Sequence, residues 1–431
     1  MAQPQITKQT ARATKRAIEQ ALKKGYPPPG EPVPRGGVGA LAAAADAMGM
    51  PRPSMPGRLK AIERMGLGPD WSKYEPADLV VETIPGQFGD LRDEVKSLRK
   101  RIKELEKQEG VEEAVLRTFG KLNSTPADPP GWSVSEKSTG AQVVLPITMW
   151  SDWHAGESVS LAEVGVNEFN SSILERRVRR LVETTIHLIK NHGPGDKAPG
   201  LILLLGGDMV SGGIHEELRD TDDATPFEAS LHVRDLLVWG INKLHEAFGR
   251  LYIPAVAGNH GRDSHKPRYK GTVYHNWDWA ISQMVAKEFT SNKDIVFDIP
   301  AANEVAFNVF GRTHLLLHGD QIGARGGDGH IGPIGPIMRG AMKVRQQQAS
   351  LGRKVEKVWM GHYHQTQFLP GVVVNNTLKG YDEFAAKALR VQPTPPSQVL
   401  AYCTPRHGII SCSEVFVEDM PDAPSRKWGK G

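Results

Sequence analysis

From Gln142 onward, short apolar runs alternate with helical patterns, and five of these runs end in side chains that can bind a metal. The alternation predicts an α/β domain. The runs are VVLPITMWSDWH, which ends in Asp152 and His154; LILLLGGD, which ends in Asp208; LYIPAVAGNH, which ends in Asn259 and His260; THLLLHGD, which reaches His318; and KVWMGHYH, which ends in His362 and His364. Because α/β sheets place their ligand crevices at the carboxyl ends of strands, we expect these side chains to meet at one edge.

The polar side chains at these strand ends predict a metal centre. A buried carboxylate without a partner is costly, so it takes up a proton or binds a cation. The donors are oxygen and nitrogen, and the two cysteines are too few for a multi-cysteine zinc site, which favours divalent first-row metals. There are too many donors for one ion. Two ions about 3.5 to 4 Å apart would stabilise both oxygens of an in-line displacement at phosphorus.

The order D-x-H, G-D, G-N-H, H and G-H-x-H resembles the motifs of the calcineurin-like metallophosphoesterase superfamily. In this chain the motifs read D-W-H at 152–154, G-D at 207–208, G-N-H at 258–260, His318, and G-H-Y-H at 361–364, and the resemblance covers about residues 143–417. The chain is also similar to phage-encoded members of that superfamily. The resemblance implies a four-layer sandwich, in which two mixed β-sheets are flanked by helices.

The resemblance also implies two divalent metal ions. Manganese is the metal we expect, with zinc, iron or magnesium as alternatives. The first ion would be held by Asp152, His154, Asp208 and His364, and the second by Asp208, Asn259, His318 and His362. Asp208 would then bridge the two ions.

His260 has no metal in this scheme and is the candidate catalytic residue, as an acid or as an electrostatic partner of the leaving group. Most relatives have an acidic residue after G-N-H to orient this histidine, whereas this chain has Gly261. Asp263 or Asp320 could take over that task.

A basic segment, GNHGRDSHKPRYK, follows the third strand. Its cations are Arg262, Lys266, Arg268 and Lys270, and only Asp263 opposes them. Arginine grips phosphate oxygens with two donors and lysine neutralises them, so the segment predicts a substrate-binding phosphate track. A solvated basic loop is the alternative. We expect Arg325, in a glycine-rich loop after His318, to touch the substrate as well.

The first 131 residues are expected to stand apart from the catalytic domain. We divide the chain into a basic tail and Pro/Gly-rich linker at 1–35, a helix-turn-helix module at 36–75, a linker with a short heptad-type helix at 76–131, and the metallophosphoesterase domain at 132–431. The module could equally be a structural helical hairpin, and Ser54 is the expected N-cap of its second helix. The heptad pattern at 90–109 could form a homodimer.

The sequence has no apolar stretch of about 20 residues and no secretory signal, so we expect no membrane partner and a cytoplasmic location, in the host if the chain is phage-encoded. A net charge of +4 is too small to prove a polyanionic partner. We predict a dinuclear metallophosphoesterase that hydrolyses a DNA phosphodiester. The alternatives are a phosphatase acting on small molecules or phosphoproteins, and a DNA-associated adaptor with an inactive metal site.

Overall fold

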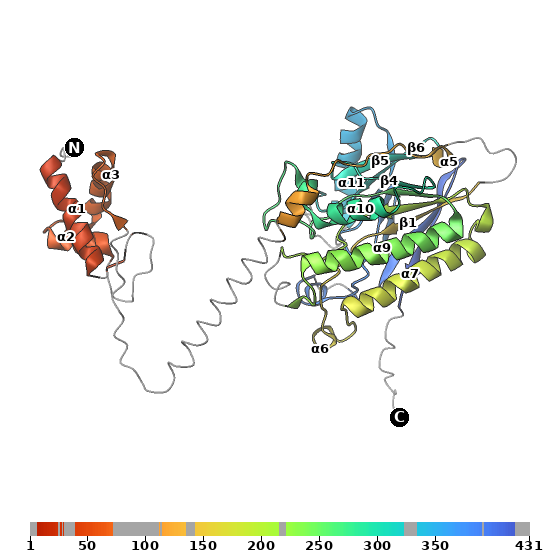
Figure 1. Cartoon of the computed structure of the whole chain (residues 1–431), viewed down its shortest axis with the longest axis horizontal. Coiled ribbons are helices and arrows are strands. Elements are labelled where there is room, and N and C mark those ends of the chain that lie inside the picture. Colours follow the sequence, from red (N-terminus) through yellow and green to blue (C-terminus); the bar gives the residue numbers. More distant parts are fainter. Residues whose placement is uncertain are drawn as a thin grey trace, which may run out of the picture. The chain divides into compact units, whose positions relative to one another are not determined.

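The computed structural model divides into two compact units, residues 1–100 and 101–431 (Figure 1). The structure describes residues 7–24, 26–27, 29, 39–71, 112, 114–134, 143–214, 221–322, 334–389 and 392–418. None of the helices in these ranges is long and apolar enough to cross a membrane. The heptad pattern at 90–109 lies outside the described residues, so its role in a homodimer stays a prediction.

The first unit contains α1 (Lys8–Lys23), α2 (Ala40–Ala47), the 3₁₀ turn η1 (Arg52–Ser54) and α3 (Met55–Arg64). The basic tail expected at residues 1–35 therefore contains a helix instead. The reason is a stripe of small and apolar side chains at helical spacing, of which Ala11, Ile18 and Leu22 are fully buried. This stripe packs against Ala44 of α2 and Met55 of α3 in a core of their own.

The helix, turn, helix pattern expected within 36–75 is formed by α2, η1 and α3. Ser54 stands at the N-cap of α3 but has helical backbone angles, and no side-chain capping bond is made. Its hydroxyl donates to the carbonyl of Pro51 at 2.6 Å instead. The pattern is common to hairpins that bind DNA and hairpins that do not, so a DNA-binding role for this segment stays a prediction.

The second unit is an α/β sandwich of two mixed sheets. The first sheet has the strand order β11-β10-β1-β2-β3-β4, with β1 (Leu145–Trp150), β2 (Leu201–Leu205), β3 (Leu251–Pro254), β4 (Ile295–Asp298), β10 (Ser397–Thr404) and β11 (Gly408–Phe416). The second has the order β5-β6-β7-β9-β8, with β5 (Glu304–Val309), β6 (Arg312–Leu317), β7 (Val355–Met360), β8 (Gln367–Leu369) and β9 (Val372–Val374).

Helices cover the outer face of each sheet (Figure 1). The first sheet packs against α7 (Ser171–His192), α9 (Pro226–Phe248) and α10 (Trp277–Glu288), and the second against α11 (Ile334–Ser350). Shorter elements are α5 (Gly131–Val134), α6 (Leu161–Val164), the 3₁₀ turns η3 (Gly195–Lys197) and η4 (Thr272–His275), and the π-helical η5 (Ala385–Leu389). The expected fold class, with two helix-flanked mixed sheets and a helical N-terminal region, is confirmed.

The continuous apolar runs of the sequence follow from burial on both faces of a sheet. In β2, Leu203 and Leu205 point into the core under the helices, while Ile202 and Leu204 point into the core between the two sheets. A strand with helices on one face and a second sheet on the other has no solvent-facing position, so no polar alternation is needed.

Candidate metal centre

Loops at the carboxyl ends of parallel strands carry all of the expected metal ligands. In the first sheet β1, β2 and β3 run parallel, and in the second sheet β6 and β7 do. Asp152 and His154 follow β1, Asp208 follows β2, Asn259 and His260 follow β3, His318 follows β6, and His362 and His364 follow β7. The structure therefore brings donors from both sheets to a shared edge, where the loop after β7 contacts the loop after β1.

Most of these donors stand on left-handed backbone. Among the residues that the structure describes, the non-glycine residues with positive φ are Asp152, His154, Asp208, Phe310, His362 and His364. This conformation costs on the order of 1 to 3 kcal/mol per residue and persists only where the surroundings impose it, most often at functional sites. Five of the six are expected ligands, so the strain is concentrated at this centre.

The first ligand group consists of Asp152, His154 and His364, whose ligand atoms all lie within 4.8 Å of one another. The Nε2 atoms of His154 and His364 are 2.9 Å apart, and Nε2 of His364 is 3.5 Å from Oδ1 of Asp152. The peptide N–H of His362 donates to the same Oδ1 at 2.9 Å, which ties the loop after β7 to the loop after β1.

The second ligand group consists of Asp208, His318 and His362. Nε2 of His318 lies 2.9 Å from Oδ2 of Asp208 and 3.1 Å from Oδ1 of Asn259. His362 and His364 would share a face if the segment were an extended strand, but their left-handed backbone sends them to different groups. The structure joins Asp208 to the second group, and its bridging role toward the first stays a prediction.

The donors of both groups fit divalent cations. Oδ2 of Asp208 is buried and accepts no hydrogen bond, although Nε2 of His318 is 2.9 Å away. The Nε2 atoms of His154 and His364 face each other at 2.9 Å, so one cation can bind the lone pairs of both nitrogens. Carboxylate oxygen, imidazole nitrogen and an amide oxygen are the donors that first-row divalent metals accept.

The electrostatics of the site keep two ligand histidines neutral and a third protonated when no metal is bound. Burial lowers the pKa of His362 to about 4, and it lowers that of His154 well below its ordinary value, so both imidazoles are neutral near pH 7. The pKa of His318 is raised well above its ordinary value. Burial lowers it, but the carboxylate of Asp208 outweighs burial. A metal must displace that proton.

Asp278, a residue that sequence reasoning missed, holds two of the ligand loops together. Its buried carboxylate accepts the backbone N–H groups of Asp208 (2.9 Å), Met209 (3.0 Å) and Gly258 (2.8 Å). Burial, reinforced by the charge of Asp208, raises the pKa of Asp278 to about 6. The only nearby feature that the sequence offers is Asn276, two residues earlier, which caps the first turn of α10. An N-cap predicts where a helix begins, but it does not predict that Asp278 supports the ligand loops.

Two motif glycines are required because ligand carboxylates pass over them. A Cβ atom at Gly361 would lie 2.1 Å from Oδ2 of Asp152, and one at Gly258 would lie 2.2 Å from Oδ1 of Asp208. No side chain fits at either position without moving the ligand. Each glycine therefore makes room for a ligand carboxylate from another strand end, Gly361 for that of Asp152 and Gly258 for that of Asp208.

His260 lies beside the first group, with its ring centroid 4.7 Å from that of His154. Its peptide N–H donates to Oδ1 of Asp208 at 2.7 Å, and its Nδ1 is 2.9 Å from the carbonyl oxygen of Ser211. Burial lowers its pKa. Asp263, considered as the orienting residue, faces Nδ1 of His275 at 2.7 Å instead.

Gly261, where the resemblance led us to expect an acidic residue, has no room for one. A Cβ atom there would lie 2.5 Å from Oδ1 of Asn276 and 3.2 Å from Cγ of Asp278. The space is already filled by two residues that begin α10. A backbone carbonyl at Ser211 therefore faces Nδ1 of His260 where a carboxylate was expected.

The basic segment has two parts with different surroundings. The guanidinium of Arg262 donates to three carbonyls of its own loop, those of Asn259, Ser264 and His265, so it shapes the loop that carries a ligand. Lys266, Arg268 and Lys270 are exposed, and Tyr269 between them is 97% exposed. Arg325 lies outside the described residues, and its contact with substrate stays a prediction.

No protein-family model matches the chain, and no curated protein matches it. One solved structure to which it is similar is titled a "Putative 5'-Nucleotidase from Staphylococcus aureus in complex with alpha-ketoglutarate". The two are 12% identical, the match covers 64% of this chain and 55% of that chain, and the TM-score is 0.26. The chain thus spans little more than half the length of that structure. The likeness is too distant to carry an argument, and the similarity to phage-encoded proteins stays a prediction.

Proposed function

We propose that the chain is a metal-dependent phosphoesterase with two ions at its centre. The observation that carries this proposal is the pair of neighbouring Asp and His groups at the carboxyl edges of the two sheets. Two adjacent cations of this type lower the pKa of a bound water to about 7 and neutralise charge on a phosphoryl group.

The side chains of this chain have separate tasks in that reaction. Asp152, His154 and His364 would hold the first ion, and Asp208, Asn259, His318 and His362 would hold the second. His260, whose Nδ1 faces the Ser211 carbonyl, holds or delivers a proton at its other nitrogen for the leaving oxygen. The loops after the strands exclude water from the buried donors.

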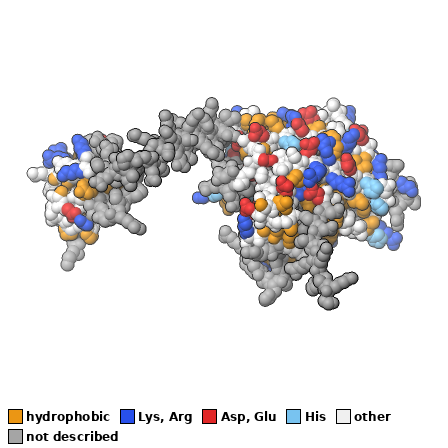
Figure 2. Space-filling model, turned by 90° about the horizontal axis from the view of Figure 1, so that it is seen from below, with side chains coloured by type: hydrophobic (Ala, Val, Ile, Leu, Met, Phe, Trp, Pro, Cys, Tyr) orange, Lys and Arg blue, Asp and Glu red, His pale blue; other side chains and the backbone are white. Residues whose placement is uncertain are grey.

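We further propose that the substrate is a DNA phosphodiester. The support is the exposed trio Lys266, Arg268 and Lys270 with the exposed ring of Tyr269, because cations that track phosphates and aromatic rings that stack on bases recur in nucleic-acid sites. Figure 2 shows Lys and Arg side chains on the first unit as well. Exposed cations of that unit are Lys8, Arg12, Lys23 and Lys24 of the first helical segment and Lys60 and Arg64 of α3. We propose that these exposed cations of the first unit bind the phosphates of DNA.

The deciding experiment assays the full-length protein, loaded in turn with Mn, Mg, Zn and Fe, on DNA, RNA, nucleotides and a phosphomonoester. We expect manganese-dependent cleavage of DNA that is lost in Asp208→Asn. Hydrolysis of phosphomonoesters alone would make the chain a phosphatase. DNA binding without hydrolysis by any loaded form would make it an adaptor.

The phosphate track has its own test, based on salt. Each phosphate contact contributes about 0.9 to the slope of log affinity against log salt for duplex DNA. We expect Lys266→Ala with Lys270→Ala to reduce that slope by nearly two. Lys243→Ala, which removes a cation on α9 that pairs with Glu246, is the matched control and should leave the slope unchanged. Equal slopes in all three proteins would argue against the track.

A further inference from the structure

His154 has one ring nitrogen at the first ligand group and the other in a separate buried environment. Nε2 faces His364 at 2.9 Å. Nδ1 is buried, makes no hydrogen bond, and lies 3.6 Å from Oε2 of Glu157. If a metal takes the lone pair of Nε2, the ring proton must sit on Nδ1, and Glu157 is the carboxylate that faces it. Nothing in the sequence alone singles out Glu157.

Glu157 is itself held from two other directions. It is 5% exposed, and its Oε1 accepts from the ammonium of Lys379 at 2.9 Å. Its Oε2 accepts from the hydroxyl of Ser211 at 3.0 Å. Ser211 also presents its carbonyl to His260, so the same residue contacts His260 directly and contacts Glu157, which faces His154. Glu157 therefore has a fixed orientation toward Nδ1 of His154.

Lys379 is buried between two carboxyl groups. Its Nζ lies 2.9 Å from Oε1 of Glu157 and 2.5 Å from Oδ2 of Asp382. Burial lowers its pKa, but the two carboxylates outweigh burial and raise it. One ammonium balances only one of the two carboxyl groups. An uncompensated buried charge is costly, and a cation on the far side of His154 would compensate it.

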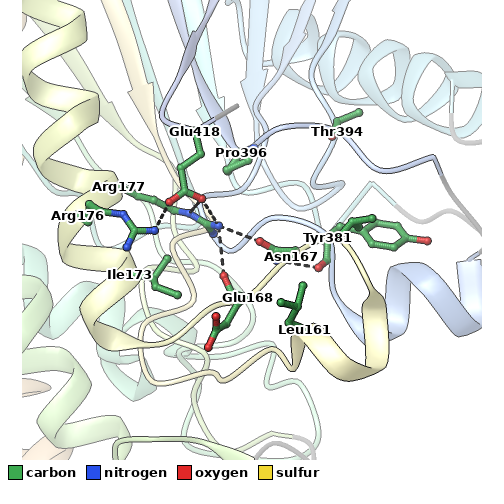
Figure 3. Close-up of a pocket in the computed structure, with 11 residues that line it drawn as sticks. Leu161, Asn167, Glu168, Ile173, Arg176, Arg177, Tyr381, Thr394, Pro396 and Glu418 are labelled. Atoms are coloured by element: carbon green, nitrogen blue, oxygen red, sulfur yellow. Dashed lines mark hydrogen bonds and ion pairs between the residues drawn. The ribbon is translucent and has the colours of Figure 1, made fainter. Parts of the chain in front are cut away.

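The backbone of Lys379 is anchored by a network next to a pocket of about 280 Å³, shown in Figure 3. The guanidinium of Arg177 donates to the carbonyls of Leu378 and Lys379, both at 2.7 Å. Its remaining donors go to the side chains of Asn167 and Glu418 and to the carbonyl of Glu168. Because the donors of Arg177 are used within the protein, its guanidinium is not free for a ligand, and the network serves to place Lys379.

We propose that Glu157 is a positioning residue that accepts a hydrogen bond from Nδ1 of His154 and so aims Nε2 at the first metal ion, with Lys379 fixing Glu157 for this task. This inference rests on the proposed function. Histidine ligands nearly always donate their second ring N–H to a carboxylate, carbonyl or water. The 3.6 Å separation must shorten by about 0.4 Å to become a hydrogen bond, a change expected when the ion draws the ring into place.

The test measures Mn²⁺ affinity by calorimetry in the full-length protein, without any substrate. We expect Glu157→Gln to weaken one of the two sites about 10- to 100-fold, the usual effect of losing such a partner. Placed in His362→Ala, which spares the first group, the change should weaken the remaining site. Placed in His364→Ala, which spares the second group, it should have no effect. Equal weakening in both backgrounds, or in neither, would overturn the proposal.

Glu175→Gln is the matched control, because Glu175 pairs with Arg179 on the exposed face of α7. It should leave both sites unchanged, and thermal melting of the metal-free proteins checks that each variant is folded.

A measurement on the unmodified protein keeps the proposal testable if Glu157→Gln does not fold. With histidine ring nitrogens labelled and Zn²⁺ bound, NMR should find the His154 proton on Nδ1, shifted downfield and protected from exchange. A proton on Nε2, or a rapidly exchanging one on Nδ1, would contradict it. If the wild-type protein binds no metal, the proposed function fails together with this inference. If it binds two ions and Glu157→Gln binds them equally, only this inference fails.

Discussion

Replacing Gly361 by alanine should remove the first metal site and spare the second. The new Cβ would lie 2.1 Å from Oδ2 of Asp152, whereas ordinary contact begins at 3.4 Å, so the carboxylate must move by about 1.3 Å. Metal sites tolerate displacements of only about 0.2 Å in their bond lengths. We therefore expect the first site to lose more than about 100-fold in affinity, which exceeds the loss of a supporting partner. Overpacking should also cost about 1 to 3 kcal/mol of stability.

The assay is the number of Mn²⁺ ions retained per chain after dialysis, measured by elemental analysis. Wild-type protein should retain two and Gly361→Ala one. Gly258→Ala, whose Cβ would lie 2.2 Å from Oδ1 of Asp208, should also retain one or fewer. Gly131→Ala, where a Cβ meets nothing within 4 Å, is the control and should retain two. A folded Gly361→Ala protein that retains two ions with wild-type affinity would refute the reasoning.

Three further predictions concern the residues around the second group. Asp278→Asn leaves at least one buried backbone N–H facing an amide donor, so the metal-free protein should lose about 1 to 3 kcal/mol of unfolding free energy in denaturant titrations; no loss would contradict that role. Because the pKa of His318 is raised, metal binding near pH 6 to 7 should release the proton of His318, and the metal affinity should weaken as pH falls. Calorimetry in buffers of different ionisation heat measures this proton release. Binding heats that do not depend on the buffer would contradict the prediction. Arg262→Lys should weaken the second site, since lysine cannot reach three carbonyls at once, and an unchanged affinity would show that the loop of Asn259 does not need the guanidinium.

The sequence could predict which parts of the chain meet because the relevant information is local to each strand end. A run such as LILLLGGD predicts both a buried strand and a polar residue at its carboxyl end, and parallel strands bring such ends together. The fold class follows from the same alternation. The left-handed backbone of the donors could not be read in advance, since Asp and His adopt it only where the fold imposes it.

The supporting residues could not be predicted, because their tasks depend on tertiary contacts. Asp278 lies 70 residues from Asp208 along the chain, and Lys379 lies 222 residues from Glu157. Helix α1 was missed for a different reason. Its buried stripe contains two alanines and a threonine beside two large apolar residues, so its hydrophobic signal is weak against the many lysines and arginines.

The most direct test of the account is anomalous diffraction from crystals of the manganese-loaded protein. We expect two peaks, one bonded to Asp152, His154 and His364 and the other to Asp208, His318 and His362. A single peak, or peaks bonded to other residues, would contradict the claim that these loops form a centre for two metal ions.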